Sequence, residues 1–275
     1  MWFRMVNVSL ILPGIRTNNW YNFYQSALEA CKEFSFELVI VSPFDLPKEL
    51  VDLPYKNIKL IKDYGCPSRA TQLAVLNAEG EFIYNCVDDG LFFQKSIDYA
   101  LNYCYRFDYM DILNMRYREQ QGGSGTQLPF DFWYAWYHDE LRLPGIKREW
   151  KISLHFLMRK ALYLELGGVD CQFEYVNHGA HDLMFRIQEL GGKIYDSSIE
   201  GLNCEHMPGI SGDHKPIHDA QISHDKPIFD FIYQNPNAAK ERLHLNLHNW
   251  KDSPEIWTRR FDPNNLPTKY EDLLK

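Results

Sequence analysis

The sequence lacks paired cysteine motifs, an excess of basic residues and any hydrophobic run long enough to cross a membrane. Its six cysteines are scattered and none forms a C-x-x-C pair, which favours a reduced, cytoplasmic protein over a disulfide scaffold. A formal net charge of −8 argues against a nucleic-acid partner, because binding to phosphates needs basic patches. The apolar run at residues 6–13 is too short for a membrane span, so it predicts a first strand and leaves peripheral membrane association open.

The first 90 residues alternate between strand patterns and helix patterns. Strands are expected at residues 6–12, 36–42, 57–62 and 81–87, and helices at 20–33 and 66–78. This order predicts an α/β protein with a mostly parallel sheet and helices on both faces. Ligands of such sheets bind beyond the carboxyl ends of the strands.

The remainder of the chain is less regular. Helices are expected at residues 95–107, 153–166 and 182–190, and strands at 110–116 and 193–199. Beyond residue 208, proline, histidine, asparagine and aspartate dominate. This composition predicts loops and short helices, packed as a tail or lid.

An acidic pair, Asp88-Asp89, follows the fourth expected strand and precedes Gly90. Adjacent carboxylates repel each other in a dry site, and a divalent cation such as Mn²⁺ or Mg²⁺ relieves that repulsion. Asp-Asp-Gly is also good turn chemistry, so the tripeptide alone favours a surface turn. Its position at the end of an apolar strand, where a ligand site is expected, supports a metal site.

Other polar residues each have two interpretations. Asp182, beside His181 at the start of an expected helix, is either a helix cap or a general base. His206 is either a loop histidine or a further metal ligand. Arg69 is either a solvated helix residue or a partner for a diphosphate.

Two further features leave alternatives open. Trp133 and Trp136 lie in a densely aromatic segment, which suits core packing or stacking on sugar rings about equally. His-Asp dipeptides recur, which raises a rival hypothesis, a helical metal-dependent phosphohydrolase. The strand-rich first half disfavours that hypothesis, because such a scaffold would need these dipeptides on packed helices.

The order of the motifs resembles that of family 2 glycosyltransferases with the GT-A fold, of the Asp-x-Asp type. Besides the acidic pair, the matching segments are Ser9-Leu10-Ile11-Leu12-Pro13, Glu37-Leu38-Val39-Ile40-Val41, Ser68-Arg69-Ala70-Thr71-Gln72-Leu73-Ala74, Ala78-Glu79-Gly80-Glu81-Phe82-Ile83, Gly167-Gly168-Val169-Asp170 and Asp182-Leu183-Met184-Phe185-Arg186. The likeness covers roughly residues 6–206, and the order makes it fairly specific. It implies a Rossmann-like nucleotide-diphospho-sugar transferase fold with a mostly parallel central sheet.

The resemblance also implies a role for each site residue. Asp89 would hold Mn²⁺ or Mg²⁺ on the donor diphosphate with His206 as a further ligand, and Asp88 would contact the ribose. Asp182 would be the base that activates the acceptor hydroxyl in an inverting transfer. Further donor contacts are implied for Pro13, Gly14, Arg16 and Arg69, and acceptor contacts are expected from Trp133, Trp136 and His181.

The expected protein is therefore one catalytic domain over residues 1–275. Residues 1–110 would bind the nucleotide sugar, residues 111–207 the acceptor, and residues 208–275 would form the tail or lid. The donor would be a UDP- or GDP-sugar, and the acceptor a hydroxyl of a glycan, a lipid-linked sugar or a similar molecule, as in polysaccharide biosynthesis.

The sequence departs from the family pattern in two places. Many relatives end the second strand with an acidic residue that reads the base, whereas this chain has Ser42-Pro43-Phe44 there. The usual Glu-Asp before the last helix is replaced by Ala180-His181-Asp182, so Asp182 can instead align with a later aspartate, which would leave the base elsewhere. Two other functions stay open: a nucleotidyltransferase, whose glycine-rich loop is absent, and a non-catalytic nucleotide- or carbohydrate-binding relative.

Overall fold

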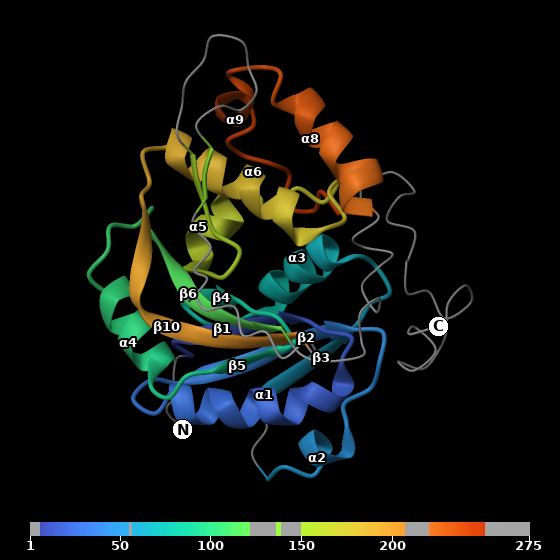
Figure 1. Cartoon of the computed structure of the whole chain (residues 1–275), viewed down its shortest axis with the longest axis vertical. Helices are drawn as coiled ribbons and strands as arrows, with labels where there is room; N and C mark the ends of the chain where they lie inside the picture. Colours follow the sequence, from blue (N-terminus) through green and yellow to red (C-terminus); the bar gives the residue numbers. More distant parts are fainter. Residues whose placement is uncertain (1–5, 55–56, 122–135, 139–149, 207–219, 251–275) are drawn as a thin grey trace.

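Eight strands form one central sheet in the order β3-β2-β1-β4-β9-β6-β10-β5 (Figure 1). The computed structural model describes residues 6–54, 57–121, 136–138, 150–206 and 220–250. The strands of the sheet are β1 (Val8–Pro13), β2 (Phe36–Ser42), β3 (Ile58–Lys62), β4 (Phe82–Asn85), β5 (Gly90–Phe92), β6 (Ile112–Gln121), β9 (Phe156–Arg159) and β10 (Ile194–His206). A separate two-stranded sheet pairs β7 (Trp136–His138) with β8 (Trp150–Ile152).

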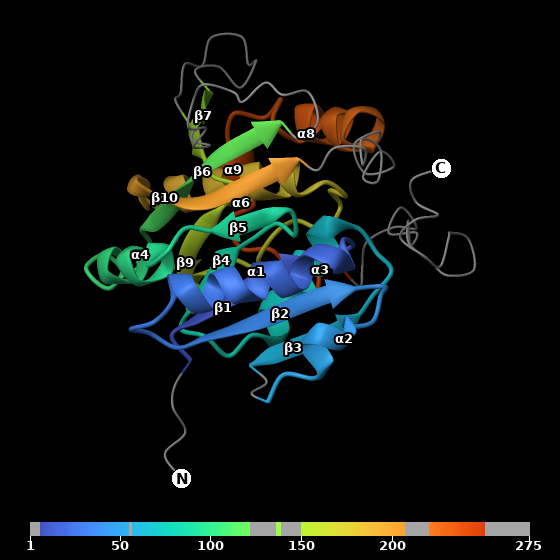
Figure 2. The same ribbon diagram turned by 60° about the horizontal axis from the view of Figure 1, so that its bottom comes forward.

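The expected parallel sheet forms in the first half of the chain. Strands β3, β2, β1 and β4 pair in parallel, and every residue of β2 is buried, as expected for a strand covered on both faces. In the rest of the sheet, β6 and β10 pair in parallel, whereas β9 runs antiparallel to both β4 and β6, and β5 runs antiparallel to β10. The sheet is therefore mixed, and the prediction of a mostly parallel sheet holds for its first half. Strands β2, β6 and β10 end on the same side of the molecule (Figure 2).

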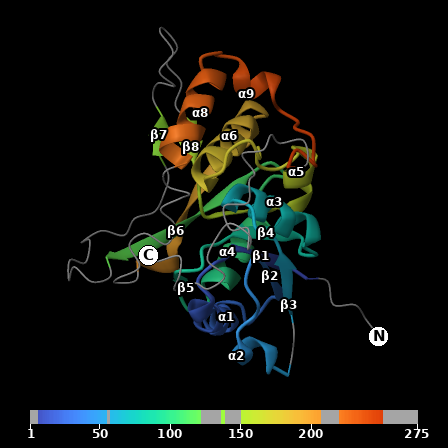
Figure 3. The same cartoon turned by 90° about the vertical axis from the view of Figure 1, so that its right-hand side faces the viewer.

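Helices cover both faces of the sheet (Figures 1 and 3). One face is covered by α1 (Thr17–Ala30) and α4 (Ser96–Cys104), and the other by α3 (Pro67–Asn77), α5 (Lys160–Glu165) and α6 (Val176–Glu189). The short α2 (Lys48–Val51) follows β2. None of the helices in the described ranges is long and apolar enough to cross a membrane. All six cysteines are buried thiols.

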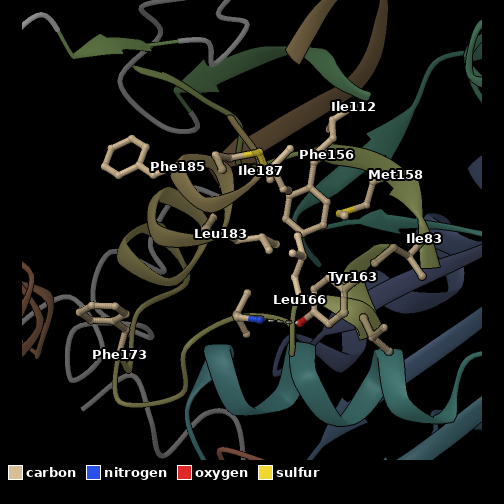
Figure 4. Packing of buried hydrophobic residues seen from close by; sticks show 14 of the residues in the cluster. Ile83, Ile112, Phe156, Met158, Tyr163, Leu166, Phe173, Leu183, Phe185 and Ile187 are labelled. Carbon is tan, nitrogen blue, oxygen red and sulfur yellow. Dashed lines mark hydrogen bonds between the residues drawn. The ribbon is translucent and has the colours of Figure 1, made fainter. Parts of the chain in front are cut away.

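The helix expected at residues 153–166 is wrong in its first half. Residues 156–159 form β9, and only residues 160–165 form a helix, α5. Phe156 and Met158 of β9 pack with Leu183 of α6 on one face of the sheet (Figure 4), while Leu157 packs on the other face. A strand buried on both faces gives a continuous apolar run, which periodicity cannot distinguish from a buried helix.

The start expected for α6 is also wrong. The helix begins at Val176, so His181 and Asp182 lie in its second turn and not at its N-terminus. Asp225, from the C-terminal part of the chain, accepts hydrogen bonds from the backbone N–H groups of Glu174 (3.0 Å) and Tyr175 (2.7 Å). A tertiary contact therefore satisfies donors just ahead of the helix.

The described C-terminal residues 220–250 belong to the core. They contain a π-helical turn (Gln221–Asp225) and the helices α8 (Lys226–Ile232) and α9 (Ala238–Glu241), in agreement with the expected short helices. Phe229 and Tyr233 are buried in the same cluster as α6. The backbone N–H of Leu245 donates to Leu166 O at 3.0 Å, which ties the segment to the end of α5.

A fully buried ion pair joins α6 to this C-terminal segment. Arg186 Nε donates to Asp182 Oδ2 at 2.8 Å, and both side chains are 0% exposed. Tyr233 Oη donates to Asp182 Oδ1 at 2.7 Å, and Arg186 also donates to the carbonyl oxygens of Leu166 and Gly168. Each charge is thus paired and hydrogen-bonded, as burial requires.

Replacing Arg186 with leucine is expected to destabilise the fold strongly. The change leaves the Asp182 carboxylate buried without its main cation, which costs about 3–5 kcal/mol in comparable pairs. Urea denaturation measures the free energy of unfolding. Lys226→Ala, which removes a half-exposed pair with Asp230, is the control and should cost less than about 1 kcal/mol. Equal effects of the two variants would contradict the proposed role of the buried pair.

His178, on α6 opposite Phe173 and Phe229, should make the fold sensitive to acid. Burial lowers the pKa of this imidazole to about 4 from its ordinary value of 6.5. Between these values the unfolded chain binds a proton that the folded chain does not, so this residue lowers stability as the pH falls, by up to about 3 kcal/mol. His178→Gln should show a smaller difference between the free energies of unfolding at pH 7 and pH 5. An unchanged difference would contradict this assignment.

Candidate functional site

A cavity of roughly 330 Å³ lies beyond the carboxyl ends of β1, β2 and β4. Its walls come from the β1–α1 loop (residues 13–16), the residues after β2 and β3, the β4–β5 turn and the N-terminus of α6. This is the place where sheets of this kind bind their ligands. Five of the residues singled out from the sequence line it, namely Pro13, Gly14, Arg16, Asp88 and Asp89.

Asp88 connects two walls of the cavity. Its Oδ2 accepts hydrogen bonds from the backbone N–H groups of Ile15 and Arg16, both at 2.7 Å, and its Oδ1 lies 2.5 Å from Arg16 Nη1. Asn19 Nδ2 donates to the Asp88 carbonyl at 3.0 Å. Asp88 therefore holds the β1–α1 loop against the β4–β5 turn, a role that the sequence did not reveal.

Gly14 allows this loop to lie close to α1. A Cβ atom at this position would lie 2.9 Å from Nε1 of the buried Trp20. A larger residue would push the loop off α1 and change the cavity wall.

Asp89 is the carboxylate at this end of the cavity that best suits a cation. Its Oδ2 lies 3.7 Å from Arg16 Nη1, and its side chain is 12% exposed. The described residues contain no cluster of three or more histidine, cysteine, aspartate or glutamate side chains that could hold a metal. Mg²⁺ is often held by one or two carboxylates together with substrate phosphates, so Asp89 fits a cation that arrives with a phosphate ligand.

The opposite end of the cavity contains Asp63, which sequence reasoning missed. Arg69 forms a bidentate pair with it, with Nε–Oδ2 and Nη2–Oδ1 distances of 2.8 Å, and the Arg69 guanidinium lies 4.9 Å from the Trp250 ring centroid. Gly65 N–H also donates to Asp63. Arg69 is not among the described lining residues, and acts on the cavity by orienting Asp63. The sequence could have indicated Asp63, since this carboxylate directly follows the third strand, at the edge of the sheet where ligands bind.

The floor of the cavity is formed by residues next to β4, β6 and β9. Asn85 Nδ2 donates to Leu154 O at 2.8 Å, and the adjacent His155 lines the cavity with its ring 4.8 Å from that of Tyr117. Sequence reasoning missed Leu154 and His155 because it treated residues 153–166 as a helix.

Three buried thiols, Cys66, Cys86 and Cys204, also line the cavity. Burial raises the pKa of both Cys66 and Cys86 far above neutrality. A protonated thiol is a poor nucleophile, so these two cysteines act here as small apolar side chains.

The other expected site residues lie elsewhere. Asp182 and His181 are not among the described cavity residues, and both Asp182 carboxylate oxygens are engaged in the buried pair. This position gives Asp182 a structural role and offers no support for its predicted role as the base. Trp133 lies outside the described residues, and for Trp136 and His206 only the backbone is described, at β7 and at the end of β10.

Comparison with solved structures identifies the fold. A crystal structure of residues 1–349 of S. aureus TarS in complex with UDP superimposes with a TM-score of 0.52 at 14% identity, covering 91% of this chain and 73% of that one. The UDP-GlcNAc complex of the same protein gives a TM-score of 0.47 at 17% identity, with 73% and 58% covered. The chain therefore shares the fold of TarS. No protein-family model and no curated protein matches the sequence.

Replacing Asp88 with asparagine should loosen the β1–α1 loop. Hydrogen bonds to a charged group contribute about 1.5–3 kcal/mol, so amide exchange at Ile15 and Arg16 should accelerate roughly 10- to 100-fold. Hydrogen–deuterium exchange mass spectrometry of the peptide containing these residues measures the effect. Asp45→Asn, at a 91% exposed side chain, is the control. An unchanged exchange rate in Asp88→Asn would show that Asp88 does not hold the β1–α1 loop.

Proposed function

We propose that this chain transfers a sugar from a nucleoside-diphosphate sugar to a hydroxyl group of an acceptor. The observation that carries the proposal is the cavity at the strand ends, where the Asp88-Asp89-Gly90 turn meets the β1–α1 loop in a glycosyltransferase fold. The UDP bound to TarS supports a uridine nucleotide as the donor, ahead of the guanosine alternative.

Asp63 is proposed to read the nucleotide base. The end of β2, where many family 2 relatives have an acidic residue, contains Ser42-Pro43-Phe44, whereas Asp63 lines the same end of the cavity from β3. The N3–H of uracil needs a hydrogen-bond acceptor, and a carboxylate oriented by Arg69 and Gly65 supplies one. Arg69 thus takes a positioning role in place of the predicted diphosphate contact.

The charge of the cavity supports a need for a divalent cation. Three aspartates, Asp63, Asp88 and Asp89, line the cavity against two arginines, Arg16 in the lining and Arg69 paired with Asp63, so negative charge is in excess. A diphosphate entering this acidic cavity would be repelled unless a cation accompanied it. When bound at Asp89, Mn²⁺ or Mg²⁺ would supply electrostatic stabilisation of the departing diphosphate. His206 as a further ligand and Asp88 as a ribose contact stay predictions.

A second candidate is a non-catalytic nucleotide- or carbohydrate-binding relative. It is favoured by the burial of Asp182 and by the rim of α6, where the described cavity residues Tyr175, Val176 and Asn177 include no carboxylate. Such a protein would bind UDP without turning over any donor.

A donor panel separates the two candidates. Release of free nucleotide from UDP- and GDP-sugars is measured with Mn²⁺, with Mg²⁺ and with a chelator, alongside UDP binding by calorimetry. Turnover that needs the cation supports the transferase, whereas UDP binding without turnover of any donor supports the binding protein. Absence of both would overturn the proposed nucleotide site.

Replacing Asp89 with asparagine should abolish most of the cation-dependent turnover. Loss of the protein ligand for the cation is expected to lower kcat by at least roughly 100-fold, similar to the loss of other charge-stabilising groups. The melting temperature should stay near that of the wild type, because asparagine has the same shape as aspartate and the Asp88 hydrogen bonds to residues 15 and 16 are retained. Asp45→Asn removes the same charge from an exposed position and should leave kcat unchanged. Full activity of Asp89→Asn would show that Asp89 is not the ligand of the cation.

A further inference from the structure

Transfer to a hydroxyl group with inversion requires a group that removes the acceptor's proton. The described carboxylates of this region are already engaged. Asp88 holds the β1–α1 loop, Asp63 is paired with Arg69, and Asp182 is buried with Arg186 and Tyr233. Asp89 is the residue that suits the cation. The base must therefore be sought among the other polar groups of the cavity.

His155 is the one imidazole among the described lining residues of the cavity. It directly precedes β9, and its carbonyl accepts a hydrogen bond from Met115 N–H at 2.9 Å, which fixes the backbone against β6. The neighbouring Leu154 carbonyl is held by Asn85 Nδ2, three residues before Asp88. Two strands thus fix the backbone from which the imidazole projects.

The ring of His155 packs against an aromatic neighbour. The Tyr117 ring meets it edge-on, with centroids 4.8 Å apart and an interplanar angle of 67°. The residue is only 6% exposed, yet it lines the cavity. A side chain shielded from solvent but open to a ligand site has the placement that general bases need.

We propose that His155 is the proton acceptor of the transfer, an inference that rests on the proposed function. As the acceptor oxygen bonds to the anomeric carbon, the bond from that carbon to the diphosphate oxygen breaks, and its electron pair leaves with the diphosphate. The hydroxyl proton moves to an imidazole nitrogen of His155 and is later released to solvent.

Tyr117 of β6 is in direct ring contact with His155. The other titratable or charged groups among the described lining residues are Arg16, Asp63, Cys66, Cys86, Asp88, Asp89, Tyr175 and Cys204. A general base accepts a proton only in its neutral form, so turnover should fall at a pH low enough to protonate this ring.

The test compares His155→Gln and His155→Ala with the wild type. UDP-GlcNAc with Mn²⁺ is the probe, and UDP release and UDP binding are measured separately. General-base variants should lose roughly 100- to 10,000-fold in kcat, while the Kd for UDP stays within about threefold. Added imidazole should raise the kcat of His155→Ala at least tenfold. The fall in kcat at acidic pH should disappear in His155→Gln. His244→Gln, at an exposed histidine, is the control and should match the wild type.

Each contrary result is distinct. A kcat within about threefold of the wild type in His155→Gln would overturn the base role. A parallel loss of UDP binding and turnover would make His155 a donor-binding residue, which also overturns it. Failure of the proposed function would appear instead in the wild type, as absence of turnover of any donor, with or without UDP binding.

Discussion

The Asp88 carboxylate is the contact on which the shape of the site depends. It lies three residues after the end of β4, and it accepts three hydrogen bonds from residues 15 and 16 after β1. Since β1 and β4 are adjacent parallel strands, their carboxyl ends lie side by side, and one short side chain can join the two loops. Arg16 then lies beside both aspartates and offsets part of their charge. A surface turn and a ligand site are therefore not alternatives here, because the turn is what shapes the cavity.

A second set of contacts holds the opposite wall. Asp225 fixes the backbone before α6, and the Asp182–Arg186 pair with Tyr233 anchors the same helix to the C-terminal segment. These residues are far apart in sequence, and their burial requires that each charge be satisfied by the others. Residues 220–250, which the composition predicts to be a tail or lid, therefore support the rim of the cavity at Tyr175–Asn177. The division of the chain into donor, acceptor and lid parts stays a prediction.

Local patterns predicted the first half of the fold well and the second half less well. Strands β1 to β4 and helices α1 and α3 form where the sequence predicts them. In these segments the apolar periodicity and the residues that start or end each element, such as Pro67, favour the same structure as the tertiary packing. At residues 153–166 the local pattern predicts a helix, whereas residues 156–159 of the structure form a strand. Because β9 is buried on both faces, its apolar residues do not alternate with polar ones, and the two-residue period of a strand cannot be seen in the sequence. The start of α6 is set by Asp225, some fifty residues later in the chain, and no local pattern carries that information.

The sequence by itself determined the α/β architecture, the acidic turn after the fourth strand and the glycosyltransferase resemblance, since each follows from short-range periodicity and motif order. Only the tertiary structure decided the roles of the polar residues. Asp88 binds the β1–α1 loop, whereas Asp89 lies in the cavity wall near Arg16. Arg69 is paired with Asp63, and Asp182 is buried in an ion pair with Arg186. The tertiary structure also brought His155 into the cavity. The physical reason is that the partners of a carboxylate or an imidazole come from other parts of the chain, and burial decides which of these partners each group must have.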